Sequence, residues 1–158
     1  MLDGQVNAME RFSLEFISLI VGKQSFCIEI DRIREIRRWE PITMLPHSPN
    51  YVLGVVNLRG AVIPIVDLAI KLGFDPISPT KRNVIIITSF ETKMVGFLVD
   101  AVSEILTVTN EDIKEAPKMN SGTINHLVRG VITNGDDMTR IVDIDVLLAH
   151  QEVLENAI

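Results

Sequence analysis

The sequence has few of the residues that build catalytic, metal-binding or disulfide-bonded sites. Among its 158 residues there is a single cysteine, Cys27, so no disulfide can form within the chain. Cys27 lies in the apolar run 25–30, which predicts a buried and unreactive thiol. The three histidines, His47, His126 and His150, lack the spacing of a metal site, and no metalloprotease, nucleophile-elbow or phosphate-loop motif occurs. We therefore expect no metal, no cofactor and no catalytic residue.

The chain is also short of positive charge and of long apolar runs. It carries 15 Lys and Arg against 21 Asp and Glu, a formal net charge of −6, which disfavours nucleic acid and anionic lipid as partners. The longest apolar stretches, such as 84–87, are far shorter than a membrane span, and the N-terminus lacks the pattern of a signal peptide. These features predict a cytoplasmic protein with no direct membrane insertion.

What the sequence does contain is an internal repeat. Residues 26–36 and 95–105 share a strand-like run followed by Asp, any residue, an aliphatic residue, any residue, Glu and Ile. A second pair of segments, 54–67 and 130–143, shares a Gly-aliphatic start and an aliphatic-Asp end at the same spacing. The chain therefore reads as a duplicated unit.

The repeat sets the expected domain boundaries. We expect a single domain over residues 11–150, with subdomain halves at about 11–75 and 81–150. The segment 75–80 contains two prolines and is the predicted connection between the halves. Residues 1–10 and 151–158 are predicted to be tails.

The repeated segments are rich in Val, Ile and Phe over five to eight residues between turn signals, which is typical of β-strands. Several are apolar at consecutive positions, which indicates burial on both faces. Hairpin turns are predicted at 57–60 and 134–137, and short helices at 67–72 and 143–150, each opened by an aspartate. The predicted fold class is mainly β, with two small β-barrels from the duplication and a few short helices.

One enzymatic alternative follows from the duplication. An aspartate from each half could share a proton across a pseudo-two-fold axis, as in aspartic proteases, and the candidate pairs are Asp67 with Asp143 or Asp31 with Asp100. The residues that follow Asp67 and Asp143 do not resemble an exposed catalytic turn, and all four aspartates look like helix or strand caps. We therefore predict a protein that binds other proteins and is not an enzyme.

The motifs 57–68 (NLRGAVIPIVDL), 30–36 (IDRIREI) and 96–100 (GFLVD) together resemble the CheW family of bacterial chemotaxis coupling proteins. The resemblance extends from about residue 11 to residue 148. It implies two SH3-like five-stranded β-barrel subdomains and no catalytic activity.

The implied function is that of an adaptor which couples methyl-accepting chemoreceptors to the chemotaxis histidine kinase in signalling arrays. The implied partners are the kinase's regulatory domain and the cytoplasmic tips of the receptors, and the resemblance also allows contacts with other copies of the coupling protein. Receptor arrays would then recruit the protein to the inner face of the membrane. The alternatives are a generic SH3-like protein-interaction module and a relative tuned to a non-chemotaxis receptor–kinase pathway.

The resemblance also implies two sets of binding residues. Those expected at the receptor are Ile33, Glu35, Arg59, Val62, Val95 and Val99. Those expected at the kinase are Ile42, Leu45 and Gly54.

Some of these positions allow a second interpretation from the residues alone. Ile33 and Val95 fit a buried core as well as a receptor groove, because an apolar residue in a barrel is usually inside. Glu35 and Arg59 are expected to approach each other at an exposed rim and to form an ion pair. The segment Arg38-Trp39 departs from common family usage, where a smaller turn is frequent.

Overall fold

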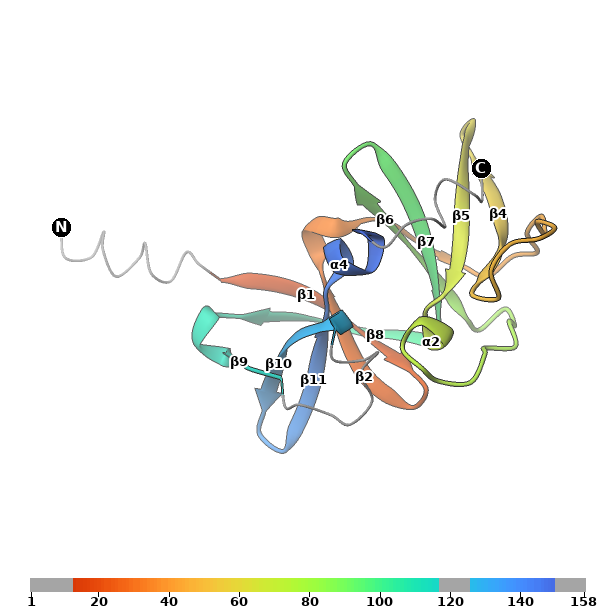
Figure 1. Cartoon of the computed structure of the whole chain (residues 1–158). Coiled ribbons are helices and arrows are strands. Elements are labelled where there is room, and N and C mark those ends of the chain that lie inside the picture. Colours follow the sequence, from red (N-terminus) through yellow and green to blue (C-terminus); the bar gives the residue numbers. More distant parts are fainter. Residues whose placement is uncertain (1–12, 117–125, 150–158) are drawn as a thin grey trace.

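The computed structural model describes residues 13–116 and 126–149, and these form a mainly β protein (Figure 1). The predicted fold class is confirmed in this respect. The first half of the chain provides β1 (Leu14–Val21), β2 (Gln24–Glu29), β3 (Ile33–Arg38), β4 (Val52–Leu58) and β5 (Ala61–Asp67). The second half provides β6 (Val84–Phe90), β7 (Lys93–Val99), β8 (Ala101–Val108), β9 (Ile113–Lys114), β10 (Val128–Asn134) and β11 (Asp137–Val142).

The helices are short. The α-helices whose bounds lie within the described residues are α2 (Leu68–Lys71) and α4 (Ile144–Ala149), and the 3-10 helices there are η1 (Ile30–Arg32) and η2 (Asn110–Asp112). Both α-helices follow the aspartates expected to open them, although His150, the predicted last residue of the second helix, lies outside the described residues. The predicted tails lie outside them as well.

The strands form two sheets that match each other in order. The five-stranded sheet runs β3-β6-β7-β5-β4, and the six-stranded sheet runs β8-β1-β2-β11-β10-β9. In both sheets the first three strands are antiparallel neighbours, and a parallel pair (β7 with β5, β2 with β11) joins them to a hairpin. Figure 1 shows the five-stranded sheet on one side of the molecule and the six-stranded sheet on the other. The predicted duplication is therefore visible in the topology.

The two sheets do not follow the two halves of the chain. The hairpin β1–β2 of the first half lies in the six-stranded sheet, whereas β3, β4 and β5 lie in the other. The hairpin β6–β7 of the second half lies in the five-stranded sheet, whereas β8 to β11 lie in the other. A boundary near 75–80 therefore does not separate two structural subdomains, because each half gives strands to both sheets. The halves are interlocked, which ties the sheets together covalently and by hydrogen bonds.

The fold class agrees with the expected pair of five-stranded β-barrels, but the two sheets are not closed and one of them has six strands. In the described part of the chain no ladder joins the end strands β3 and β4, or β8 and β9. The chain instead links the edges: beyond β3 it reaches Thr43, which exchanges two backbone hydrogen bonds of 3.0 and 2.8 Å with Val55 of β4. Beyond β8 it continues through η2 to β9, which pairs with β10.

Matching glycines mark the two hairpins. Gly54 in β4 and Gly130 in β10 lie at equivalent register shifts, opposite Ile65 and Ile141 respectively. Gly54 has φ +153°, and a Cβ added there would lie 2.2 Å from the Thr43 carbonyl oxygen. A glycine is therefore required where the chain beyond β3 crosses β4.

Three apolar clusters hold the fold together. The main core lies between the sheets and includes Leu19, Phe26, Ile86, Phe97, Leu68 and Leu147, so that it draws on both sheets and both α-helices. A second cluster fills the concave side of the five-stranded sheet with Leu58, Ile63, Ile65, Ile85, Ile87 and Leu98. The corresponding cluster of the six-stranded sheet is smaller and consists of Phe16, Cys27, Ile132 and Ile141. Cys27 is buried, as predicted, and burial raises the pKa of its thiol to about 12.

Two of the aspartates considered for a catalytic pair cap local structure instead. The buried Asp67 carboxylate accepts hydrogen bonds from the Ala69 and Ile77 backbone N–H groups, both at 2.9 Å, and burial raises its pKa above the ordinary value. Asp143 accepts a bond from the Val146 N–H at 3.1 Å in the equivalent position. Asp100 accepts one from the Gly22 N–H at 2.9 Å. The cap interpretation therefore accounts for Asp67 and Asp143, whereas Asp100 binds the distant β1–β2 turn and Asp31 lies exposed in η1.

Candidate functional site

The site begins with Glu35 on the edge strand β3. Half-buried and exposed residues alternate in this strand, and Glu35 and Arg37 lie on the same, half-buried side. The Glu35 carboxylate accepts a hydrogen bond of 3.1 Å from Arg59 and another of 3.1 Å from Arg37. These two guanidinium groups, Arg59 first and Arg37 second, lower the pKa of Glu35 below its ordinary value. Glu35 therefore remains ionised with both of its oxygens engaged.

Arg59 reaches Glu35 from the tight turn between β4 and β5. The turn residues Arg59 and Gly60 have φ +53° and +88°, which is the left-handed pair of a two-residue hairpin, as the motif predicted. The Asn57 side-chain oxygen accepts a hydrogen bond of 3.0 Å from the Gly60 N–H and fixes the turn. A non-glycine residue in this conformation is strained, and such strain is concentrated at functional sites. The arginine is therefore held in place by the turn.

The pair joins two elements that are far apart in the sheet. β3 is one edge of the five-stranded sheet, and the β4–β5 turn belongs to the opposite edge. The Glu35–Arg59 ion pair bridges these edges across the mouth of the concave side, beside the backbone link from Thr43 to Val55. The Arg59 side chain is 76% exposed and that of Glu35 28%, so the expectation of an ion pair on an exposed rim agrees with the geometry.

Two exposed apolar side chains lie close in the sequence to the residues of the ion pair. Val62, in the strand that follows the turn, is 46% exposed, and Ile36, next to Glu35, is also exposed. Val62 is among the residues expected at the receptor and Ile36 is not, and the alternation of β3 places Ile36 on the face opposite to that of Glu35. Ile33 is half-buried and packs against the main core.

Two of the residues expected at the receptor are inside the protein. Val95 is 1% and Val99 0% exposed, and both pack in the main core from β7. A partner cannot touch these side chains in this conformation. The structure thus favours the second interpretation of Val95, as a core residue, and extends it to Val99.

The residues expected at the kinase lie on and beneath the segment between β3 and β4. Ile42 is half-buried against the cluster of the five-stranded sheet, and Leu45 is half-buried against the main core. Met44 lies between them and is 80% exposed, a residue that the sequence analysis missed although prolines flank the segment. Gly54 is buried beneath the segment and has no side chain to offer, so its role is to let Thr43 approach.

Within residues 13–116 and 126–149 no group of three or more His, Cys, Asp or Glu side chains is placed to hold a metal ion. None of the helices in the described part of the chain has the length and apolar content needed to cross a bilayer.

Comparison with known proteins identifies the family. The family model described as "CheW-like domain" matches residues 15–152, which is most of the chain. The chain belongs to the CheW family. A probable chemotaxis protein CheW from Rhizobium etli is 45% identical over 93% of this chain and 95% of its own length, and a chemotaxis protein CheW from Rhizobium meliloti is 46% identical over 87% and 89%.

More distant CheW proteins agree with this assignment. The chemotaxis protein CheW of Klebsiella aerogenes is 33% identical over 92% of this chain and 88% of its own length. The crystal structure of the scaffolding protein TtCheW from Thermoanaerobacter tengcongensis has a TM-score of 0.76 and 25% identity, and covers 82% of this chain and 88% of that one. CheW-family proteins are scaffolds, so this chain is a chemotaxis coupling adaptor and not an enzyme.

Proposed function

We propose that this CheW-family protein couples methyl-accepting chemoreceptors to the chemotaxis histidine kinase, and that the Glu35–Arg59 rim transmits the signal between them. The observation that carries the proposal is the ion pair itself. It is largely exposed on the arginine side, it is held by a strained turn, and it spans the two edges of one sheet. Such a pair contributes little to stability, so its geometry is better explained by binding than by folding.

The receptor surface that we propose consists of Ile33, Glu35, Arg59 and Val62. It combines an ion pair with half-buried and exposed apolar side chains, the mixture found in transient protein interfaces. Val95 and Val99 support this surface from within the core and do not touch the partner. The helical tip of a receptor would then lie over the rim.

The kinase surface that we propose lies on the segment between β3 and β4. Met44 provides an exposed apolar anchor, and Ile42 and Leu45 fix the segment by packing inward. Gly54 contributes by letting the segment lie close against β4. The two surfaces are joined by the Thr43–Val55 hydrogen bonds, so displacement at one is transmitted to the other through a short rigid path.

The coupling is thermodynamic. A receptor that changes conformation shifts the equilibrium between the active and inactive states of the kinase. The size of this shift is set by how differently the assembly binds the two kinase states. Two interlocked sheets suit this purpose, because each half of the chain gives strands to both sheets and so resists their relative movement. The protein acts in the cytoplasm, where the receptor tips recruit it to the inner face of the membrane, and other copies of it join the same array.

A capture experiment tests the proposal. Tagged wild-type protein should recover a histidine kinase and chemoreceptors from a cell extract, as identified by mass spectrometry, and Arg59→Glu should recover fewer receptors. Arg82→Glu is the matched control, because Arg82 is exposed elsewhere and forms no ion pair with a described residue. Recovery of neither partner class by the wild type would contradict the proposal and favour a generic interaction module or a different pathway.

A further inference from the structure

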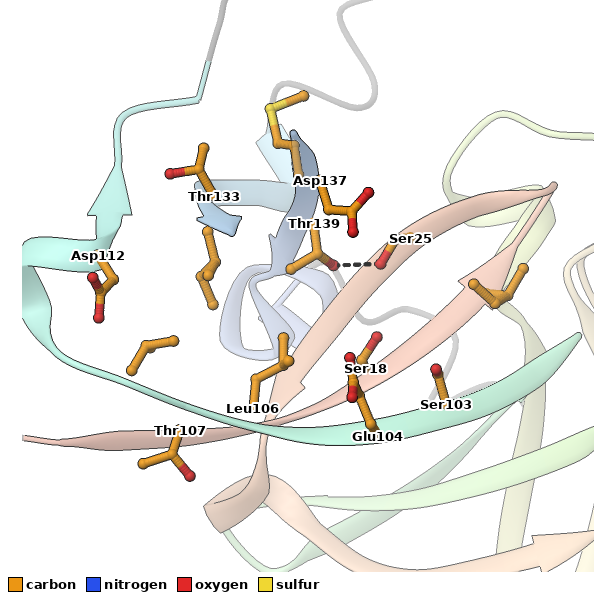
Figure 2. A pocket seen from close by; sticks show the side chains of 14 residues that line it. Ser18, Ser25, Ser103, Glu104, Leu106, Thr107, Asp112, Thr133, Asp137 and Thr139 are labelled. Carbon is orange, nitrogen blue, oxygen red and sulfur yellow. Dashed lines mark hydrogen bonds between the residues drawn. The ribbon is translucent and has the colours of Figure 1, made fainter. Parts of the chain in front are cut away.

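The six-stranded sheet contains a cavity at the place where the five-stranded sheet is filled. Its volume is about 450 Å³, within the range of ligand sites. Figure 2 shows that it is lined by hydroxyl groups from β1, β2 and β11, among them Ser18, Ser25 and Thr139, with Glu104 and Asp137 at its margin.

The duplication explains how the cavity arises. The matching registers of the strands place Thr139 where the other sheet has Ile63, and Ser18 where it has Ile87. Ser25 likewise takes the place of Met94. The first sheet fills this space with large apolar side chains, whereas the second has three short hydroxyl side chains there. The hollow therefore results from specific substitutions and not from loose packing.

The hydroxyl groups are arranged to meet a polar ligand. The Ser25 hydroxyl donates a hydrogen bond of 2.8 Å to that of Thr139, whose side chain is buried. Ser18 is 5% exposed and lines the cavity, yet no hydrogen bond from its hydroxyl to another described residue is found. The Ser18 hydroxyl is therefore open to the cavity and available to a polar group that enters it.

The charge at the margin indicates what enters. Glu104 in β8 is equivalent to Glu35 in β3. The pairing of β8 with β1 shifts its register between Ile17 and Leu19, and the equivalent pairing of β3 with β6 shifts its register between Ile33 and Glu35. Glu35 is neutralised by two arginines, whereas the equivalent positions near Glu104 are Leu106 and Gly135. Glu104 is exposed and has no ion pair with any residue in 13–116 or 126–149.

Two further features belong to this margin. Asp137 adds a second carboxylate where the other sheet has Ala61, and none of the described residues that line the cavity is basic. Met138, which lines the cavity, and Ile105, next to Glu104 in β8, are exposed apolar side chains, and such residues are typical of protein contacts.

We propose that this cavity binds an arginine side chain supplied by a protein partner. The guanidinium group would pair with Glu104 as that of Arg59 pairs with Glu35, and the aliphatic stem would lie against Leu106 and Ile132. The hydroxyl of Ser18 accepts one of the remaining N–H groups. The site lies on the other sheet from the Glu35–Arg59 rim and does not rest on the function proposed for that rim.

A titration with small probes tests the assignment. Isotope-labelled full-length protein is titrated with N-acetyl-arginine amide, and backbone amide resonances are followed by NMR. Saturable shifts are expected at Ser18, Ser103 and Thr139, and the matching lysine amide and uncharged citrulline amide should bind more weakly. Shifts that are no larger at the cavity than elsewhere, or equal affinities for the three probes, would overturn the proposal.

Two pairs of variants sharpen the test. Glu104→Gln should weaken binding of the arginine probe by about tenfold or more, as expected for loss of a charge-assisted hydrogen bond, while Glu40→Gln should not. Gly135→Arg should also abolish binding, because it supplies an arginine from the position equivalent to Arg59. That position has space for a side chain, since an added Cβ would meet no atom within 4 Å, and its φ of +65° is the same strained left-handed conformation that Arg59 adopts at +53°.

The control for this change is Gly135→Gln, which adds length without charge and should leave the probe bound. Equal binding by Glu104→Gln and the wild type would overturn the proposal. A cross-linking amino acid in place of Ile105 then tests the protein source. Cross-linked peptides from a cell extract should contain an arginine near the linked residue and disappear in Glu104→Gln; cross-links that are unaffected by that change would contradict a partner arginine.

Discussion

Replacing Val95 by alanine should destabilise the fold, whereas the same replacement at Val62 should not. Val95 is 1% exposed in the main core, and Val62 is 46% exposed in the strand after the Arg59 turn. Removing two buried methyl groups costs about 1.6 kcal/mol in transfer free energy, and the cavity left behind raises the loss to about 2–3 kcal/mol. The exposed valine should lose less than about 0.5 kcal/mol.

The assay is thermal and urea-induced unfolding of both variants. For a chain of this length each kcal/mol lowers Tm by about 2–4 °C, so Val95→Ala should lower it by about 4–12 °C and Val62→Ala by no more than about 2 °C. A glutamate at each position extends the comparison: Val95→Glu buries an unpaired charge and should lose the fold, while Val62→Glu should fold and weaken receptor binding.

The outcome distinguishes a core residue from a contact residue. Val95→Glu that folds with the wild-type Tm and no longer binds receptor would refute the reasoning, because it would make Val95 a surface contact. Equal losses of stability in Val62→Ala and Val95→Ala would refute it as well.

Three other predictions follow from the same structure. Gly54→Ala should lower Tm strongly and disturb the segment around Thr43, because the new Cβ would lie 2.2 Å from a backbone oxygen. Gly135→Ala is the control, because a Cβ at that position would meet no atom within 4 Å, and similar Tm values for the two variants would contradict this prediction. The raised pKa of Asp67 means that its ionisation disfavours the folded state, so the wild type should lose stability as pH rises from about 4, the unfolded pKa, through the folded pKa. Asp67→Asn should lack this part of the pH dependence in urea unfolding, and identical profiles would argue against it. Leu45→Asp should impair kinase binding and spare receptor binding in pull-downs at equal fold content, and equal loss of both would indicate one shared surface.

The duplication and the fold class could be predicted because they depend on local patterns. The Asp-x-aliphatic-x-Glu-Ile segments and the glycine-to-aspartate spacing recur in the sequence, and they do become equivalent strands. The exchange of strands between the halves could not be predicted. β3 and β8 each follow their own hairpin in sequence and pair with the hairpin of the other half, a choice made by tertiary packing and not by a strand's own composition.

The site divides in the same way. The Glu35–Arg59 pair follows from a recognisable motif, and Arg37 could have been added because it lies two residues away on the same face of a strand. The burial of Val95 and Val99 could not be read from the sequence, because the apolar residues of β7 are consecutive and show no alternation that would distinguish an inner from an outer side. The cavity required the register of both sheets.

The most direct test of the central claim is a charge exchange at the Glu35–Arg59 pair, measured in a reconstituted receptor-coupled kinase assay. Because the pair lies on an exposed rim, Glu35→Arg and Arg59→Glu should each fold normally by circular dichroism and lose receptor control of the kinase. The double variant should recover part of that control, since it restores the opposite charges across the two sheet edges. A double variant no better than either single one, with all three folded, would show that the two residues do not act as a pair.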